Sequence, residues 1–123
     1  MKALRVLCWI SGGYDLMLAA GMLLLAPQVA AFMGSSPPQP LVNAQLNGVF
    51  TLSLGVGYFW AAQAIEQRLG YVWVAGVLAK GLGTALFVFD HFTQGSPVSF
   101  LLFAVTDGAQ AVASAVLLLR PRA

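Results

Sequence analysis

Four long apolar runs occupy most of this chain and leave little sequence for anything else. They cover approximately residues 4–26, 41–64, 71–89 and 98–119 of the 123-residue sequence. Each run is close to the roughly 20 residues with which an α-helix crosses a hydrocarbon core of about 30 Å. A helix also satisfies its own backbone hydrogen bonds inside a membrane. We therefore predict an all-α integral membrane protein, one domain folded as an antiparallel bundle of four transmembrane helices.

The composition supports a membrane environment and excludes an ordinary soluble domain. Hydrophobic residues make up 59% of the chain, charged residues 8%, and the mean hydropathy is +0.83. A soluble domain carries about 25% charged residues. The net charge of +2 comes mostly from basic residues at the ends of the runs, so it predicts topology and no nucleic-acid partner. The lipid bilayer is the first expected partner.

The basic residues predict the orientation of the bundle. Lys2 and Arg5 precede the first run, Arg68 lies between the second and third, and Arg120 and Arg122 follow the fourth. The other two loops carry no Lys or Arg. Because basic residues concentrate on the cytoplasmic side of membrane proteins, we expect both termini to be cytoplasmic.

Two groups of residues near the ends of the runs are expected at the membrane surfaces. Around the inner loop, four aromatic residues predict an interfacial belt, and we favour this over a ligand-binding cage. The outer loop, residues 27–40, predicts a short lid whose apolar residues lie in the interface. The belt residues are Tyr58, Trp60, Tyr71 and Trp73, and the lid residues are Val29, Phe32 and Met33.

Three ionisable residues, Asp15, Lys80 and Asp107, lie near the middle of three different runs. A charge at bilayer depth costs at least roughly 2.5–3.5 kcal/mol, so such residues are candidate functional sites. At about 1.5 Å per residue from the cytoplasmic ends, their depths are roughly 16, 14 and 19 Å. Helices of a small bundle lie about 8–10 Å apart, so Lys80 can reach one carboxylate or lie between two.

The three charges have a structural and a functional interpretation, and the sequence leaves both open. A buried ion pair can fix which helices meet, or it can form part of a ligand site. Further amides and a hydroxyl belong to the candidate site. Asn43 and Asn47 share one helix face, as do Thr106 and Gln110, and together they can line a polar cavity open to the outside. Hydrogen bonding between helices explains them equally well.

Small residues recur along the runs and predict close helix packing. Glycines and alanines at a spacing of four let the backbones of membrane helices approach one another. A second interpretation applies to Gly81 and Gly83, which can leave room for a ligand beside Lys80. The main packing candidates are Gly48, Gly55, Gly57, Gly76, Ala104, Gly108, Ala111 and Ala115.

The sequence contains no recognisable catalytic or metal-binding set. The single histidine, His91, follows Asp90 at the end of the third run, where we expect it to cap the helix or to be solvated. One histidine and one cysteine cannot complete a zinc or haem site, and we expect no cofactor. Cys8 is most simply a small apolar residue, with lipid attachment as a second interpretation. An independent enzyme is not expected.

A series of short motifs marks the runs and the first loop. They are, in order, Asp15, Leu25-Ala26-Pro27, Gly34-Ser35-Ser36-Pro37-Pro38, Asn47-Gly48, Gly57-Tyr58, Lys80-Gly81 and Asp107-Gly108. This order resembles small bacterial four-helix membrane proteins of the DoxX-like kind over nearly the whole chain. The resemblance implies a multi-pass protein of the prokaryotic plasma membrane that acts as an accessory subunit of a redox system or binds lipophilic molecules. It transfers no catalytic residue to this sequence.

Two functional classes follow. We favour a non-catalytic accessory or scaffolding subunit that packs with other membrane proteins or with copies of itself, because the loops are short and the helices are rich in small residues. The alternative is a stand-alone binder or carrier of a small lipophilic or protonatable ligand, such as a quinone, a lipid or an amine, at the Asp15, Lys80 and Asp107 site. A proton-coupled transporter is a third possibility.

Charge balance at the site makes the first testable prediction. Two ionised aspartates facing one lysine would leave a surplus negative charge in a medium of low dielectric constant. We expect one of the two carboxyl groups to be protonated near neutral pH unless a cation or ligand joins it. Infrared titration of carboxyl groups in the reconstituted protein measures this directly. Two ionised aspartates without a bound cation would contradict the prediction.

Overall fold

The computed structural model describes residues 1–121, and every regular element within them is helical. The all-α prediction is therefore confirmed. The elements are α1 (Lys2–Leu24), α2 (Ala26–Phe32), α3 (Leu41–Gln63), η1 (Ile65–Gln67), α4 (Leu69–Tyr71), η2 (Val72–Ala79), α5 (Lys80–Gln94), η3 (Val98–Phe100) and α6 (Leu101–Leu119). Elements α4, η2 and α5 form one continuous helical segment, and η3 leads directly into α6.

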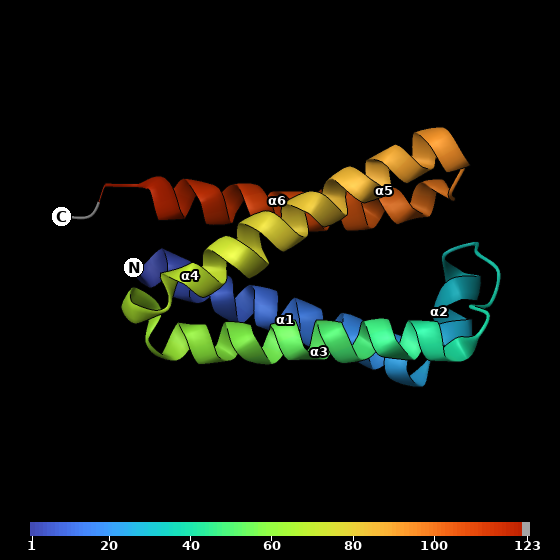
Figure 1. The fold of residues 1–123 in the computed structure, drawn as a ribbon, viewed down its shortest axis with the longest axis horizontal. Helices are drawn as coiled ribbons and strands as arrows, with labels where there is room; N and C mark the ends of the chain where they lie inside the picture. Colours follow the sequence, from blue (N-terminus) through green and yellow to red (C-terminus); the bar gives the residue numbers. More distant parts are fainter. Residues whose placement is uncertain (122–123) are drawn as a thin grey trace.

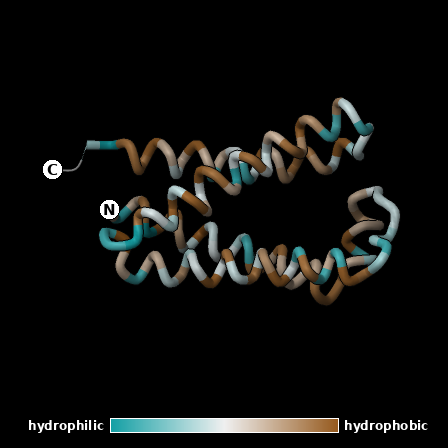
Figure 2. The backbone as a smooth tube through the Cα atoms, in the orientation of Figure 1, coloured by the Kyte–Doolittle hydropathy of each residue, from teal (hydrophilic) through white to brown (hydrophobic). Residues whose placement is uncertain are grey.

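Within the described residues, 3 helical segments combine the length and hydropathy of a membrane span: Lys2–Leu24, Leu69–Gln94 and Val98–Leu119. Helix α3 has 23 residues, as many as α1. Its first turns, however, contain Asn43, Gln45 and Asn47, which lower its hydropathy. Figure 2 shows hydrophobic colour along most of the helices and hydrophilic colour mainly at the turns. The chain is thus a helical bundle with the spans of an integral membrane protein.

The helices form two antiparallel pairs (Figure 1). Helix α1 lies beside α3, and α5 lies beside α6, with η2 crossing between the pairs. Both ends of the described chain and the turn from α3 to α4 lie at one end of the bundle, and α2 lies at the other. Lys2, Arg5, Arg68 and Arg120 belong to the segments at the first end. Arg122, the remaining basic residue of the predicted orientation, lies outside the described residues.

Two helix ends differ from the sequence expectation. The first run was expected to continue to residue 26, but Leu25 leaves helical geometry (φ −134°) and a new helix, α2, begins at Ala26. Pro27 is tolerated there because the first turn of a helix has no partner for its N–H. The third run was expected to end at residue 89, but α5 continues to Gln94 and ends at Gly95, whose positive φ of 73° suits a residue without a Cβ.

The segment η2 is a π-helix, which the sequence did not indicate. Its 8 residues, Val72–Ala79, form backbone hydrogen bonds one residue longer than those of an α-helix. Because a π turn is wider than an α turn, it changes the direction in which later residues point. Lys80 is the first residue after this segment. The π-helix therefore helps to decide where the Lys80 side chain lies.

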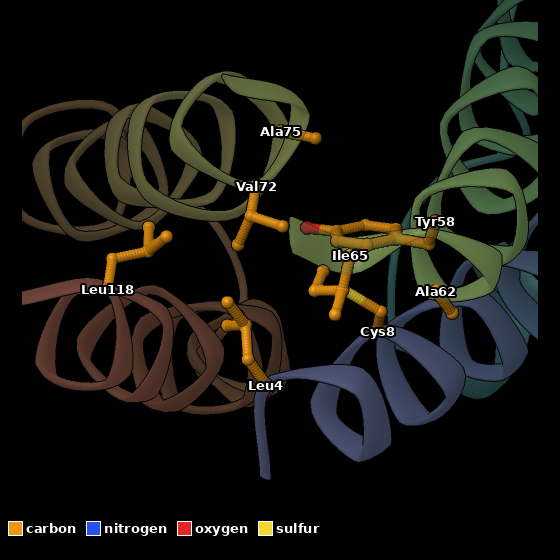
Figure 3. Close-up of a cluster of buried hydrophobic side chains, with 8 residues drawn as sticks. All are labelled: Leu4, Cys8, Tyr58, Ala62, Ile65, Val72, Ala75 and Leu118. Atoms are coloured by element: carbon orange, nitrogen blue, oxygen red, sulfur yellow. The ribbon is translucent and has the colours of Figure 1, made fainter. Parts of the chain in front are cut away.

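A compact apolar cluster joins the two helix pairs near the termini (Figure 3). Its buried members are Leu4, Cys8, Tyr58, Ala62, Ile65, Val72, Ala75 and Leu118. The Tyr58 side chain extends from α3 towards Val72 and is 1% exposed. The predicted interfacial position of Tyr58 is therefore wrong, whereas Trp60 and Trp73 are exposed. Cys8 is fully buried in this cluster, which favours its interpretation as an apolar packing residue.

Glycines permit the closest helix contacts, as their spacing predicted. A Cβ atom at Gly55 of α3 would lie 2.6 Å from Leu16 Cδ1 and 3.1 Å from the carbonyl oxygen of Gly12, both on α1. At Gly76 of η2, it would lie 2.7 Å from the hydroxyl oxygen of Ser114 on α6. A Cβ at Gly13, by contrast, would meet no atom of residues 1–121 within 4 Å. Close packing thus depends on particular glycines.

The contact at Gly55 makes a prediction about stability. We expect Gly55→Ala to lower the free energy of unfolding by about 1–3 kcal/mol, because the added methyl group pushes α1 away from α3. Gly13→Ala is the matched control. It adds the same methyl group to open space and should be neutral or stabilising by up to about 1 kcal/mol. Thermal unfolding in detergent micelles measures both, and equal destabilisation by the two variants would contradict this account of the interface.

Candidate functional site

The three buried charges predicted from the sequence meet in the structure. The Lys80 ammonium nitrogen lies 3.0 Å from Asp15 Oδ1 and 3.6 Å from Asp107 Oδ1. The side chains of Lys80 and Asp15 are 8% and 5% exposed, and that of Asp107 is 18% exposed. The contact to Asp15 is a charge-assisted hydrogen bond, whereas 3.6 Å exceeds the usual 2.7–3.2 Å range of an N–H···O bond. The ammonium group is therefore shared unequally.

Each charge is positioned by a different part of the fold. Asp15 lies on α1 against Gly55 of α3, where a Cβ would come within 3.2 Å of the Asp15 Cβ. Asp107 lies on α6 opposite Gly83 of α5, at 3.8 Å from a Cβ placed there. Lys80 begins α5 directly after the π-helix. Small residues on the facing helices thus leave room for both carboxyl groups.

Two tyrosines complete the surroundings of the lysine. The Lys80 ammonium nitrogen lies 5.0 Å from the centre of the Tyr14 ring and 5.7 Å from that of the Tyr58 ring. A cation within about 6 Å of an aromatic face is attracted by the ring quadrupole. The Tyr14 hydroxyl also shares a 2.6 Å hydrogen bond with Thr106 Oγ1. Tyr14 therefore connects α1 to α6 beside the ion pairs.

Thr84 makes a second connection next to the site. Its hydroxyl donates to the carbonyl oxygen of Lys80 at 2.9 Å, and the same proton is shared more weakly with the carbonyl oxygen of Ala104 on α6 at 3.4 Å. Gly108 allows this close approach, since a Cβ there would lie 3.2 Å from Thr84 Cγ2. The sequence interpretation missed Thr84 and gave Tyr14 no role at the site. Their positions were available as signals: Thr84 is four residues after Lys80, and Tyr14 precedes Asp15.

A cavity of about 530 Å³ lies between the two helix pairs, on the side of the site away from the termini. Asp107 lines it, together with Asn47 and Thr51 of α3. The remaining wall is largely apolar. Its larger members are Met17, Leu18, Met22, Val29, Phe50, Phe87 and Phe103. The structure therefore places one carboxyl group of the site at the wall of an apolar cavity.

The other predicted site residues divide into two sets. Asn47 lines the cavity, but Asn43 is exposed near the start of α3 and does not. Thr106 and Gln110 do not line it either. Gln110 Nε2 donates to the Thr106 carbonyl oxygen at 3.2 Å, and its Oε1 is buried without a hydrogen bond among residues 1–121. One residue corresponds to about 100° on a helix, so Asp107 and Thr106 point in different directions.

The three residues of the predicted outer lid, Val29, Met33 and Phe32, do not all lie where the sequence predicted. Val29 of α2 lines the cavity, and the neighbouring Met33 is buried. The Ser99 hydroxyl donates to the carbonyl oxygen of Met33, which ties the segment to η3. Only Phe32 projects outwards, with 89% of its surface exposed. Two of the three lid residues thus face the protein instead of the membrane surface.

His91 takes part in a turn. Its Nδ1 lies 2.8 Å from the carbonyl oxygen of Ser96, and the Ser96 hydroxyl donates to the Asp90 carboxylate. These contacts close the connection between α5 and η3. Among the described residues, no group of three or more His, Cys, Asp and Glu side chains gathers as a metal site would require.

Comparison with known proteins adds no assignment. No protein-family model matches the chain, and no curated protein or solved structure is significantly similar to it. The geometry of the site is therefore the basis on which the function of this chain is inferred.

The unequal sharing of Lys80 makes a prediction about the two aspartates. Asp15→Asn removes a buried, charge-assisted hydrogen bond and should lower the free energy of unfolding by about 1.5–3 kcal/mol. Asp107→Asn should cost less than about 1 kcal/mol, because the longer contact lies outside hydrogen-bond range. Thermal unfolding of both variants beside Glu66→Gln, which removes an exposed charge in η1 remote from the site, measures the difference. Equal losses for Asp15 and Asp107 would show that the lysine is shared evenly.

Proposed function

We propose that this chain is a non-catalytic protein of the prokaryotic plasma membrane that binds a small lipophilic ligand in the cavity between its helix pairs. In this proposal α3 is the fourth membrane span, and both termini lie on the cytoplasmic side. The shared position of the two chain ends and the α3–α4 turn supports that topology. The resemblance to DoxX-like proteins, which include binders of lipophilic molecules, remains part of the proposal.

The single observation that carries the proposal is the contact between the cavity and the charged site. The cavity, at about 530 Å³, falls within the roughly 300–1,000 Å³ range of small-molecule sites. Such sites combine apolar walls with a few polar groups that orient the ligand, and Asp107 supplies a polar group here. An ion pair with a purely structural role needs no adjoining cavity.

The two aspartates have separate roles in this proposal. Asp15 holds the Lys80 ammonium in the protein interior, through the shorter and more deeply buried contact. Asp107 remains partly accessible and faces the space that a ligand would fill. Because the three charges come from different helices, the two contacts of Lys80 also keep α1, α5 and α6 at the spacing that leaves the cavity open.

A second candidate is the accessory subunit favoured by the sequence, which packs against other membrane proteins or a second copy of itself. One observation supports it. Asn43 is exposed on α3, where its amide would meet lipid unless the membrane surface or a neighbouring helix supplied a partner. In that case the cavity would be filled by lipid tails or by the partner, and no ligand would be retained stoichiometrically.

A matched pair of substitutions tests the binding proposal. Thr51 lines the cavity, and its hydroxyl donates to the Asn47 carbonyl oxygen at 2.8 Å. Ser53, two residues further along α3, is exposed and makes the same kind of bond to the Val49 carbonyl oxygen at 2.9 Å. Thr51→Trp fills the cavity, whereas Ser53→Trp adds the same indole outside it. Both substitutions remove one side-chain hydrogen bond to the backbone.

We expect the wild-type protein and Ser53→Trp to purify with about one bound lipophilic molecule per chain, and Thr51→Trp to lose at least most of it. Native mass spectrometry of protein released from mild detergent measures this occupancy. Equal occupancy in the two variants would contradict binding in the cavity. Purification with a stoichiometric protein partner, unaffected by Thr51→Trp, would support the accessory-subunit candidate instead.

A further inference from the structure

The cavity wall and the charges beside it indicate which charge the head group of the ligand carries. The inference below rests on the proposed function, since it assigns a chemical class to the ligand of the same cavity. Within residues 1–121, Lys80 is the one basic side chain within ion-pair distance of Asp15 and Asp107. One ammonium group therefore faces two carboxyl groups.

The geometry assigns most of the lysine charge to Asp15. That carboxylate accepts the hydrogen bond at 3.0 Å, and both side chains of this pair are nearly excluded from solvent. From Lys80, Asp107 receives only the longer contact at 3.6 Å, and its side chain is more exposed, at 18%. The Tyr14 hydroxyl, which also hydrogen-bonds to Asp107, is neutral and supplies no counter-charge. Asp107 thus lacks a full counter-charge from the described residues. Its negative charge can be balanced by a proton or by a cation that enters the cavity.

The described cavity wall favours a cation over an anion. The wall contains no Lys or Arg, so an anionic head group would meet the Asp107 carboxyl without a balancing charge. Three aromatic side chains, Phe50, Phe87 and Phe103, line the same space. Aromatic faces attract cations, with the strongest effect where water is excluded. The apolar side chains Leu18 and Met22 suit a hydrocarbon tail.

We propose that the ligand is a lipophilic ammonium compound whose positively charged nitrogen pairs with Asp107, while its apolar part lies against the phenylalanines and methionines of the cavity. The hydrogen bond between Lys80 and Asp15 remains formed during binding, so Lys80 stays paired with Asp15 while Asp107 pairs with the ligand. When Asp107 is protonated in the empty protein, its carboxyl group releases that proton to water as the ammonium binds, and the ammonium takes the proton's place as the counter-charge. No bond is made or broken in the ligand.

A set of probes that differ only in the head group tests this class. Dodecylamine, dodecanol and dodecanoate carry a cationic, a neutral and an anionic head on the same chain at neutral pH. Binding is measured by equilibrium dialysis against the protein in phosphatidylcholine nanodiscs, with empty nanodiscs subtracted to remove partitioning into lipid. A signal counts as cavity binding only if Thr51→Trp abolishes it and Ser53→Trp does not.

We expect dodecylamine to bind roughly tenfold to a hundredfold more tightly than dodecanol, the range supplied by a charge-assisted hydrogen bond, and dodecanoate to bind most weakly. Asp107→Asn should reduce the affinity for dodecylamine by a similar factor and bring it close to that of dodecanol. Asp90→Asn removes the same charge from the C-terminal part of α5, away from the cavity, and should leave all three affinities unchanged. Size-exclusion profiles check that the variants remain folded.

Two results would overturn the inference in different ways. Cavity binding of dodecanol or dodecanoate at least as tight as that of dodecylamine would keep the proposed function and reject the cationic class. Failure of all three probes to give a signal sensitive to Thr51→Trp would reject both the class and the proposed binding function. The comparison among probes uses the wild-type protein, so it remains decisive even if Asp107→Asn does not fold.

Discussion

An ammonium group shared by two carboxyl groups determines how this bundle is assembled. Lys80, Asp15 and Asp107 come from α5, α1 and α6, so satisfying the lysine brings three helices to one point. A charge in a hydrocarbon layer is costly when unpaired, and this cost penalises arrangements that separate the three residues. Sharing is unequal, with contacts of 3.0 and 3.6 Å. The same constraint that joins the helices leaves one carboxyl group incompletely compensated.

Packing on either side of this site explains why a cavity exists. Near the termini, the apolar cluster around Tyr58 and Val72 draws the two helix pairs together. Close glycine contacts hold each pair, at Gly55 between α3 and α1 and at Gly108 between α6 and α5. Beyond the ion pairs the helix pairs diverge towards α2, as Figure 1 shows. The cavity lies in this region, and Asp107 forms its boundary with the charged site.

Much of the fold was predictable because apolar length and turn residues are local signals. The bounds of α3 differ from the expected run by a single residue at its end, and the fourth run agrees with η3 and α6 together. Pro27 signalled that the first helix ends, but not that the break lies at Leu25, and the π-helix Val72–Ala79 had no local signal. Tyr58 lies near the end of α3, and this position along the helix predicted a place at the membrane interface. The side chain, however, is on the face of α3 that packs against the other helices, so it is buried.

The sequence by itself determined the helical class, the basic residues at one end of the bundle, and the common depth of Asp15, Lys80 and Asp107, because these follow from composition and from rise per residue. Tertiary structure alone decided which aspartate receives the hydrogen bond, that Asn47 and not Asn43 lines the cavity, and that Phe50, Phe87 and Phe103 from three helices line the same cavity. Those outcomes depend on helix rotation and spacing, which arise only when side chains from different helices pack together.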